Sequence, residues 1–145
     1  MKYMILLVFC TAAVSCAEVP PAERPNWQEE KILTFHIVAG NWEGMTWMEP
    51  KMVREQNWAK VTIRKDGTFK FSAIRTIGAW TGEGKLHIED GKLVSPRSDQ
   101  EGTITMTLFK ADGKRMLRVD ATDAKGRIQR AELNPVQKKD KPDQS

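Results

Sequence analysis

The sequence has few of the residues on which redox, disulfide and nucleophilic chemistry depend. It contains two cysteines, two histidines and one tyrosine among 145 residues. So few cysteines cannot build the disulfide framework that stabilises many small secreted domains. The chain also lacks a Gly-x-Ser-x-Gly nucleophile elbow, a phosphate-binding glycine loop and a His-Glu-x-x-His metal motif. Because no motif of a catalytic site is present, we expect a protein that is not an enzyme and carries no cofactor.

Long apolar runs and a strong excess of one charge are missing as well. The apolar run at residues 3–10 is shorter than the roughly 20 residues that a membrane-spanning helix needs. The chain carries 23 Lys and Arg against 19 Asp and Glu, with the two signs interspersed. Such a small excess does not make a basic patch. We therefore expect no nucleic-acid partner.

The amino-terminal residues have the order of a bacterial secretory signal. Residues 1–2 supply a positive charge, residues 3–10 are apolar, and small residues follow them. The segment ends in Ala-Val-Ser-Cys at residues 13–16, which resembles the lipobox of bacterial lipoproteins, whose cysteine receives diacylglycerol before the preceding segment is removed. A thiol suits this reaction because it is a strong nucleophile and forms a stable thioether. The resemblance implies lipidation of Cys16 and removal of residues 1–15.

Lipidation would use the only cysteine of the mature chain, because Cys10 lies in the removed segment. Each buried methylene contributes about 0.8 kcal/mol, so several acyl chains on Cys16 would hold the protein stably on a membrane. Ala17 stands where aspartate commonly signals inner-membrane retention in enteric bacteria. We therefore expect a cell-envelope protein on the outer membrane, facing the periplasm, rather than on the inner membrane. The alternative is an ordinary signal peptide cleaved near Ser15 or Ala17.

The mature chain divides into a tether, one folded domain and a tail. Residues 16–25 are rich in proline and predict a stiff spacer between the lipid and the domain. Residues 137–145 are polar, lack apolar periodicity and predict a disordered tail. The intervening residues 26–136 are enough for one hydrophobic core and too few for two domains.

The folded domain has the pattern of successive hairpins. Turn signals recur at near-regular intervals, at Asp66-Gly67, Asp90-Gly91, Asp112-Gly113 and Lys125-Gly126. Asp tolerates positive φ and Gly adopts it readily, so Asp-Gly reverses the chain between twisted strands. Between the turns, apolar and polar residues alternate, as they do over residues 103–108. This period of two indicates strands with one buried face.

These signals predict an all-β fold. Sequential hairpins favour a small antiparallel up-and-down β-barrel of about eight strands, with a sandwich or a half-open barrel as alternatives. Asn26 is a good N-cap and Glu29 and Glu30 are acidic, so a short amino-terminal helix is predicted over residues 26–31. Residues 32–38 fit either a continuation of that helix or a strand that leads into the barrel. The predicted strands are 41–48, 58–65, 68–75, 78–88, 92–95, 102–110, 114–121 and 127–134.

One triplet links the predicted first strand to a known family. Gly40-Asn41-Trp42 resembles the Gly-x-Trp start of the first strand in lipocalins and related calycin-like barrels. In that family the tryptophan closes one barrel end and packs beneath an arginine from the last strand. An apolar plug under a planar cation is favourable through packing and through a cation–π contact. The resemblance implies a barrel-closing pair of Trp42 and Arg130, with Arg127 as the second choice.

The leading functional hypothesis is a lipocalin-like barrel that binds a small apolar molecule. An eight-stranded interior is either filled by side chains or just wide enough for one small ligand. The candidate cavity residues are the large apolar ones of the predicted strands, Trp42, Trp58, Phe69, Phe71, Trp80 and Met106. The alternative is an envelope interaction or assembly protein with a packed barrel, whose exposed tryptophans contact a protein partner.

A third hypothesis is a periplasmic copper(I) site. Met45, Met48 and Met52 offer the soft thioether ligands that suit this ion. Glu49 and His36 would take part only if the fold brings them close. Methionine fills cores far more often than it binds a metal, so this is the weakest of the three hypotheses.

Overall fold

The computed structural model describes residues 25–49, 57–75, 78–97, 102–123 and 125–137, and for residues 74–75, 78–80 and 96–97 it describes the backbone alone. The predicted signal segment, Cys16, most of the tether, Met52 and most of the tail therefore lie outside the described residues. Within the described ranges, no helix is both long enough and apolar enough to cross a membrane.

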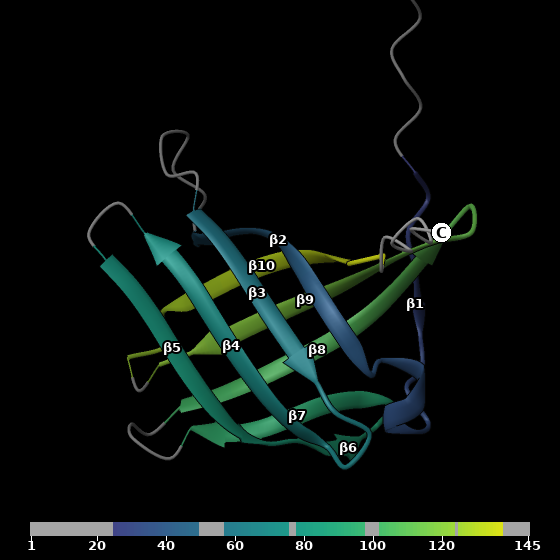
Figure 1. Ribbon diagram of the computed structural model, residues 1–145, viewed down its shortest axis with the longest axis horizontal. Helices are drawn as coiled ribbons and strands as arrows, with labels where there is room; N and C mark the ends of the chain where they lie inside the picture. The colour runs from purple at the N-terminus through teal and green to yellow at the C-terminus, as the bar shows by residue number, and fades with distance from the viewer. Residues whose placement is uncertain (1–24, 50–56, 76–77, 98–101, 124, 138–145) are drawn as a thin grey trace, which may run out of the picture.

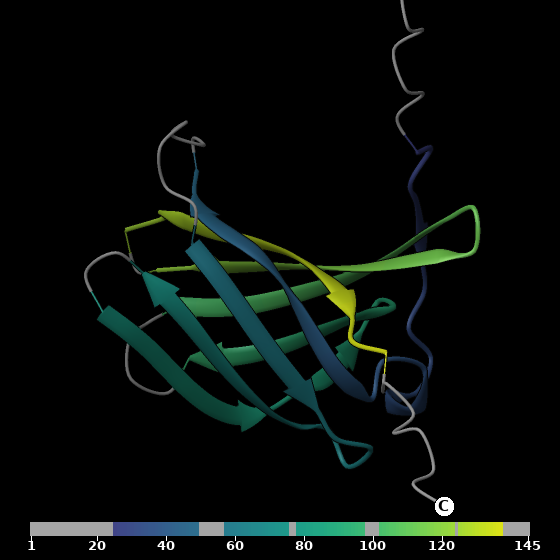
Figure 2. The same ribbon diagram turned by 45° about the horizontal axis from the view of Figure 1, so that its top comes forward.

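The fold is an antiparallel β-barrel that is nearly closed (Figure 1). Its strands are β1 Gln28–Glu30, β2 Gly40–Met48, β3 Asn57–Ile63, β4 Thr68–Arg75, β5 Gly78–Lys85, β6 His87–Glu89, β7 Lys92–Arg97, β8 Gly102–Ala111, β9 Lys114–Thr122 and β10 Ile128–Pro135. They pair in the order β5-β4-β3-β2-β10-β9-β8-β7-β6, and β1 pairs with β8. The view in Figure 2 shows how the sheet curves, so that β3 to β5 lie across the interior from β7 to β9. The all-β barrel predicted from the sequence is thus confirmed.

The hairpin turns form for the reason that the sequence suggests. At the β6–β7 turn, Asp90 and Gly91 have φ of 49° and 80°, and at the β8–β9 turn, Asp112 and Gly113 have φ of 48° and 75°. Two successive positive φ values match the right-handed twist of the flanking strands. The alternation also holds, since β3 alternates between buried and exposed residues along its whole length. Turn chemistry and the period of two therefore account for most of the strands.

The prediction of a helix over residues 26–31 is wrong. This segment contains β1, in which Gln28 faces Lys110 and Glu30 faces Leu108 of β8. The reason lies elsewhere in the chain. β7 pairs with β8 only up to Met106, so the next backbone groups of β8 need other partners, and β1 supplies them. A single capped turn of helix is too short to compete with this pairing.

Two other segments differ in detail from the predictions. Residues 32–38, which fitted a helix or a strand, hold a short 3-10 helix, η1 (Phe35–Ile37). The predicted strand 78–88 is divided into β5 and β6. Leu86 lies between them with its side chain buried, and its backbone N–H donates to the carbonyl of Gly67 at 2.8 Å. The bend therefore lies at Leu86, after the glycines of β5.

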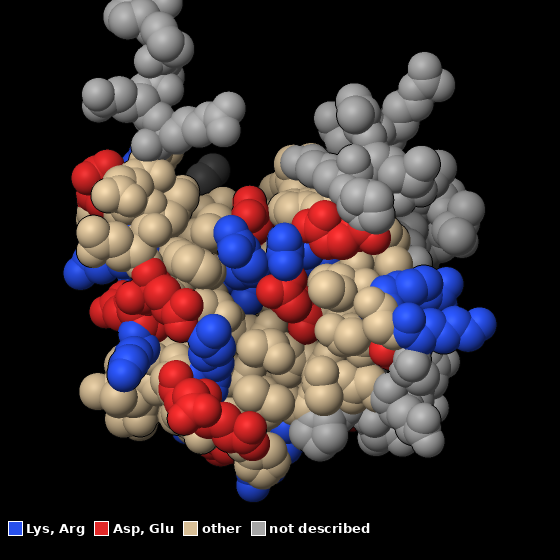
Figure 3. All heavy atoms as spheres, turned by 180° about the vertical axis from the view of Figure 1, so that it is seen from behind, with Lys and Arg blue, Asp and Glu red and all other residues tan. Residues whose placement is uncertain are grey.

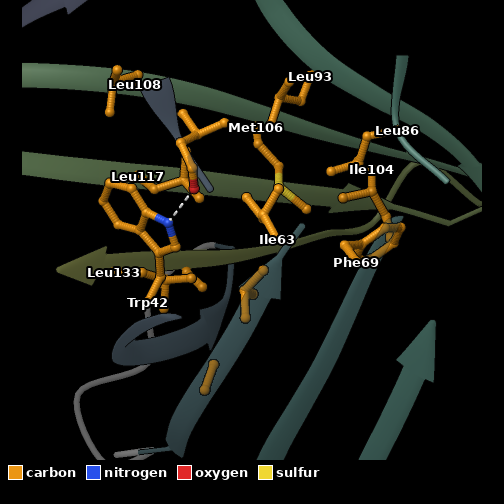
Figure 4. Packing of buried hydrophobic residues seen from close by; sticks show 14 of the residues in the cluster. Trp42, Ile63, Phe69, Leu86, Leu93, Ile104, Met106, Leu108, Leu117 and Leu133 are labelled. Atoms are coloured by element: carbon orange, nitrogen blue, oxygen red, sulfur yellow. Dashed lines mark hydrogen bonds between the residues drawn. The ribbon is translucent and has the colours of Figure 1, made fainter. Parts of the chain in front are cut away.

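The hydrophobic core fills one end of the barrel. Large side chains from both walls meet there, and Figure 4 shows them pointing into the interior. They include Ile32, Val38, Trp42, Ile63, Leu86, Leu93, Leu108, Leu117 and Leu133, all nearly inaccessible to solvent. Ile32 and Val38 come from the segment before β2, so this segment covers the end that the large side chains fill.

Candidate ligand cavity in the barrel

Side-chain size changes along the inner face of the barrel. Towards the end opposite the packed core, the inward positions carry alanine, at Ala59, Ala73, Ala121 and Ala131. In register, Ala59 of β3 faces Ala73 of β4 and Gly44 of β2. Small side chains on adjacent strands leave interior space that larger ones would fill. The barrel is therefore packed at one end and hollow towards the other.

The hollow is apolar, narrow and partly open to solvent. It gives the centres of water-sized molecules about 40 Å³ of space. One water needs roughly 10–15 Å³ by this measure, so the hollow has room for a few waters or for a slender apolar group. It is lined by Thr46, Ala59, Lys60, Val61, Phe69, Phe71, Ala73, Ile104, Met106, Val119, Ala121, Gln129 and Ala131.

Two phenylalanines form one wall of the hollow. The rings of Phe69 and Phe71 are stacked, with centroids 6.5 Å apart and an angle of 16° between planes. They lie over Gly84 and Gly82 of β5, their register partners. A Cβ atom on Gly82 would lie 2.2 Å from the Phe71 ring, and one on Gly84 would lie 3.0 Å from the Phe69 ring. These two glycines therefore make room for the aromatic wall.

Neutral polar side chains lie towards the alanine-lined end. The Thr46 hydroxyl donates to the backbone carbonyl of Arg130 at 2.9 Å, and the Gln129 amide donates to the Thr46 hydroxyl at 3.2 Å. Asn57 of β3 faces Thr46 in register and is also buried. Lys60 borders the hollow as well, but its side chain lies on the outer face of β3, where its ammonium group pairs with the Glu43 carboxylate at 2.9 Å. These residues were not predicted from the sequence, although Asn57 shares its strand face with Val61 and Ile63.

Trp42 closes the packed end. It is 2% exposed, and its indole Nε1 donates to the Val38 carbonyl at 2.8 Å (Figure 4). The guanidinium of Arg115 lies 5.5 Å from the centre of the Trp42 ring and donates to the carbonyl of Ile37. Arg115 therefore connects the tryptophan to η1. This is the arrangement of plug and cation that the Gly-x-Trp triplet suggested, with a different arginine.

Arg130 and Arg127 are not the partners of Trp42, which corrects the expected pair. Trp42 faces Pro135 in the β2–β10 register, and Arg130 faces Trp47 instead. Five residues of extended strand separate the two positions by about 17 Å. Arg115, the second residue of β9, reaches the ring because β9 begins at the packed end. Arg127 forms an ion pair with Asp123 at 2.7 Å.

Arg130 belongs to a network on the outer surface. Its guanidinium donates to Asp120 at 2.6 Å and to Glu49 at 2.8 Å, and the Trp47 indole donates to Glu49 at 3.1 Å. The hydrogen bond to Asp120 raises the pKa of Arg130 above its ordinary value, so the guanidinium stays charged. Beside it, Arg118 pairs with Glu132 at 3.3 Å. Seen from behind, this face carries basic and acidic side chains next to one another (Figure 3).

The other expected cavity residues fall into three groups. Phe69, Phe71 and Met106 line the hollow as expected. Trp58 lies outside it, because on β3 it shares the outer face with exposed Lys60 and is itself 45% exposed. Trp58 and Ala59 are neighbours on one predicted strand, so the sequence already implied that their side chains point to opposite faces. The side chain of Trp80 lies outside the described part of the structure.

Met45 and Met48, two of the three methionines expected to bind copper, do not converge. Met45 and Met48 are three residues apart on β2, so their side chains point to opposite faces of the sheet. Met52 lies outside the described residues. The Glu49 carboxylate accepts hydrogen bonds from Trp47 and Arg130. Among the described residues, no group of three or more His, Cys, Asp or Glu is placed to hold a metal ion.

No protein-family model, curated protein or solved structure matches this chain. Function is therefore argued from the geometry of the barrel. The hollow offers an aromatic wall, aliphatic contacts and neutral hydrogen-bonding groups. Apolar contact with a few placed polar groups is the usual composition of a small-molecule binding site.

Proposed function

We propose that this protein is a bacterial envelope lipoprotein, tethered by lipid on Cys16, whose barrel binds a small apolar molecule without chemical change. The single observation that carries the binding proposal is the apolar hollow beside Phe69, Phe71 and Met106. Burial of apolar surface contributes about 25 cal/mol for each Å² removed from water. A slender apolar ligand gains this free energy in the hollow while the packed end of the barrel stays intact.

The binding proposal is tested by filling the hollow. The protein used is the mature chain, residues 16–145, with Cys16→Ser, which contains every described residue. Ala131→Leu places a large side chain in the hollow, and Ala111→Leu is the matched control, since Ala111 is equally buried but does not line it. Binding of a fluorescent apolar probe at micromolar concentration should be lost in Ala131→Leu and kept in Ala111→Leu. Equal binding by both variants, or none by the parent chain, would contradict the proposal.

The tether is tested separately in cells. We propose the outer membrane, facing the periplasm, because Ala17 follows the lipidated cysteine. Labelling with an acyl-chain probe should be present in the parent chain and absent from Cys16→Ser, and membrane fractionation should place the labelled protein with the outer membrane. Labelling that persists in Cys16→Ser would show that this cysteine does not carry the lipid.

A second candidate function is interaction with another envelope protein. The observation that favours it is an apolar pair on the outside of the barrel, where Met45 and Trp58 face each other in register and are 37% and 45% exposed. Exposed aromatic residues are frequent anchors of protein interfaces. Crosslinking in intact cells should then trap a reproducible partner that is lost in Trp58→Ser. Identical crosslinks in that variant would remove this candidate.

A further inference from the structure

The two ends of the hollow differ in polarity. At its inner limit lie the large side chains that pack with Trp42, and the alanine-lined half carries a row of polar groups on three adjacent strands. The row runs from Gln129 on β10 through Thr46 on β2 to Asn57 on β3. A hydrogen bond joins the first two, and the register places the third beside Thr46. A molecule in the hollow therefore meets hydrocarbon at one end and hydrogen-bonding groups at the other.

The polar row is uncharged. The Thr46 hydroxyl already donates its one proton to the Arg130 carbonyl, so towards a ligand it can only accept, whereas the Gln129 amide can donate and accept. Together they can satisfy an alcohol, an ester or an amide. The cations nearest to it in sequence are used elsewhere, because Lys60 pairs with Glu43, and Arg130 pairs with Asp120 and Glu49 on the outer surface. A carboxylate or phosphate placed at this row would lose hydration without gaining a cation from these residues.

The small volume of the hollow limits the apolar part of the ligand. About 40 Å³ of space beside a flat pair of phenylalanine rings suits one extended alkyl chain and excludes a fused-ring system while the side chains stay in place. Deeper in the barrel, Leu117 and Leu133 are inaccessible to solvent and stop further entry.

From these observations we propose that the ligand is a single-chain amphiphile with an uncharged, hydrogen-bonding head group. Its alkyl chain lies along Phe69, Phe71 and Met106, and its head group exchanges hydrogen bonds with Thr46 and Gln129. This inference rests on the proposed binding function and narrows it to one class of molecule. It predicts that, of two lipids with equal chain length, the charged one binds more weakly, because only the charged one loses hydration without compensation.

The test compares head groups on one chain. Lauramide, laurate and dodecane compete against the fluorescent apolar probe on the Cys16→Ser mature chain near neutral pH. We expect lauramide to displace the probe at a concentration at least about tenfold below that of laurate, which corresponds to about 1.4 kcal/mol. Laurate binding as tightly as lauramide would overturn the choice of an uncharged head group. Dodecane binding as tightly as lauramide would overturn head-group recognition. In both cases the proposal that the hollow binds an apolar ligand stands. If neither the probe nor any competitor binds, that proposal is overturned as well.

Variants of the polar row test whether it causes the preference for one head group over another. Thr46→Val and Gln129→Leu remove hydrogen-bonding groups while keeping side-chain volume roughly constant, and Thr103→Val on the exposed face of β8 is the control. Preference for lauramide over dodecane should fall in the first two variants and persist in the third, with folding checked by the thermal unfolding midpoint. Unchanged preference in folded Thr46→Val and Gln129→Leu would overturn the assignment of the row.

Discussion

Gly82 controls the position of an aromatic ring that lines the hollow. In Gly82→Ala the new Cβ would lie 2.2 Å, 2.8 Å and 3.0 Å from three atoms of the Phe71 ring, so either the ring or the strand must move. The ring also borders the hollow, which can accept it. Overpacking of a full core costs about 1–3 kcal/mol, and we expect the lower part of this range because the hollow can take the ring. The displaced ring then occupies the position that we propose for the ligand.

The measurement separates this effect from a general loss of stability. Gly113→Ala is the matched control, because Gly113 has φ of 75° with no atom within 4 Å of a new Cβ. Its substitution strains the backbone by about 1 kcal/mol in a turn far from the hollow. Stability is measured by urea unfolding and binding by titration of the apolar probe. Gly82→Ala should weaken binding at least about tenfold at a stability similar to that of Gly113→Ala.

The double variant Gly82→Ala with Phe71→Leu sharpens the test. A leucine is smaller than the ring and leaves space for the new methyl group, so probe binding should return towards the parent value. The reasoning would be refuted if Gly82→Ala alone bound the probe as the parent does, or if Phe71→Leu failed to restore any binding in a folded double variant.

Three further outcomes follow from the described contacts. Arg115→Met removes the cation above Trp42 and a donor to η1, and should lower the free energy of unfolding in urea by about 1–3 kcal/mol. Trp42→Ala should cost about 3–5 kcal/mol in the same assay, whereas Trp58→Ala on the outer face should cost about 1 kcal/mol or less. Hydrogen bonds from the backbone and side chain of Arg127 lower the pKa of Asp123 below its ordinary value of 3.8. The stability that this carboxylate contributes should be full above that value and lost as the pH falls through the lowered pKa, so the parent's advantage over Asp123→Asn should shrink only in acid.

The strands could be predicted because their signals are local. Turn residues at positions 90–91 and 112–113 adopt the positive φ that Asp-Gly favours, and alternation along residues 57–63 matches the burial of β3. The segment that contains β1 could not be predicted in this way. Its partner is an edge of β8 that β7 leaves unpaired, and a sequence does not show where a distant strand ends its pairing.

The candidate site was predictable only in part. Phe69, Phe71 and Met106 lie at inward positions of alternating strands, so the sequence was enough to place them inside. The pairing of Arg115 with Trp42 required the register, because proximity to the chain end favoured Arg130 instead. Likewise, an alanine such as Ala131 indicates space only when the residues opposite it are known.

The sequence by itself determined most of the strands, where most hairpins turn and which face of these strands is apolar, because these properties depend on φ preferences and on a period of two between neighbouring residues. Tertiary structure decided which strands meet, how far they are shifted against one another, and hence which end of the barrel is filled. The space inside a barrel depends on side chains that come from different strands and lie at the same height along the barrel. The hollow, its aromatic wall on Gly82 and its polar row at Thr46 therefore exist only once the register is set.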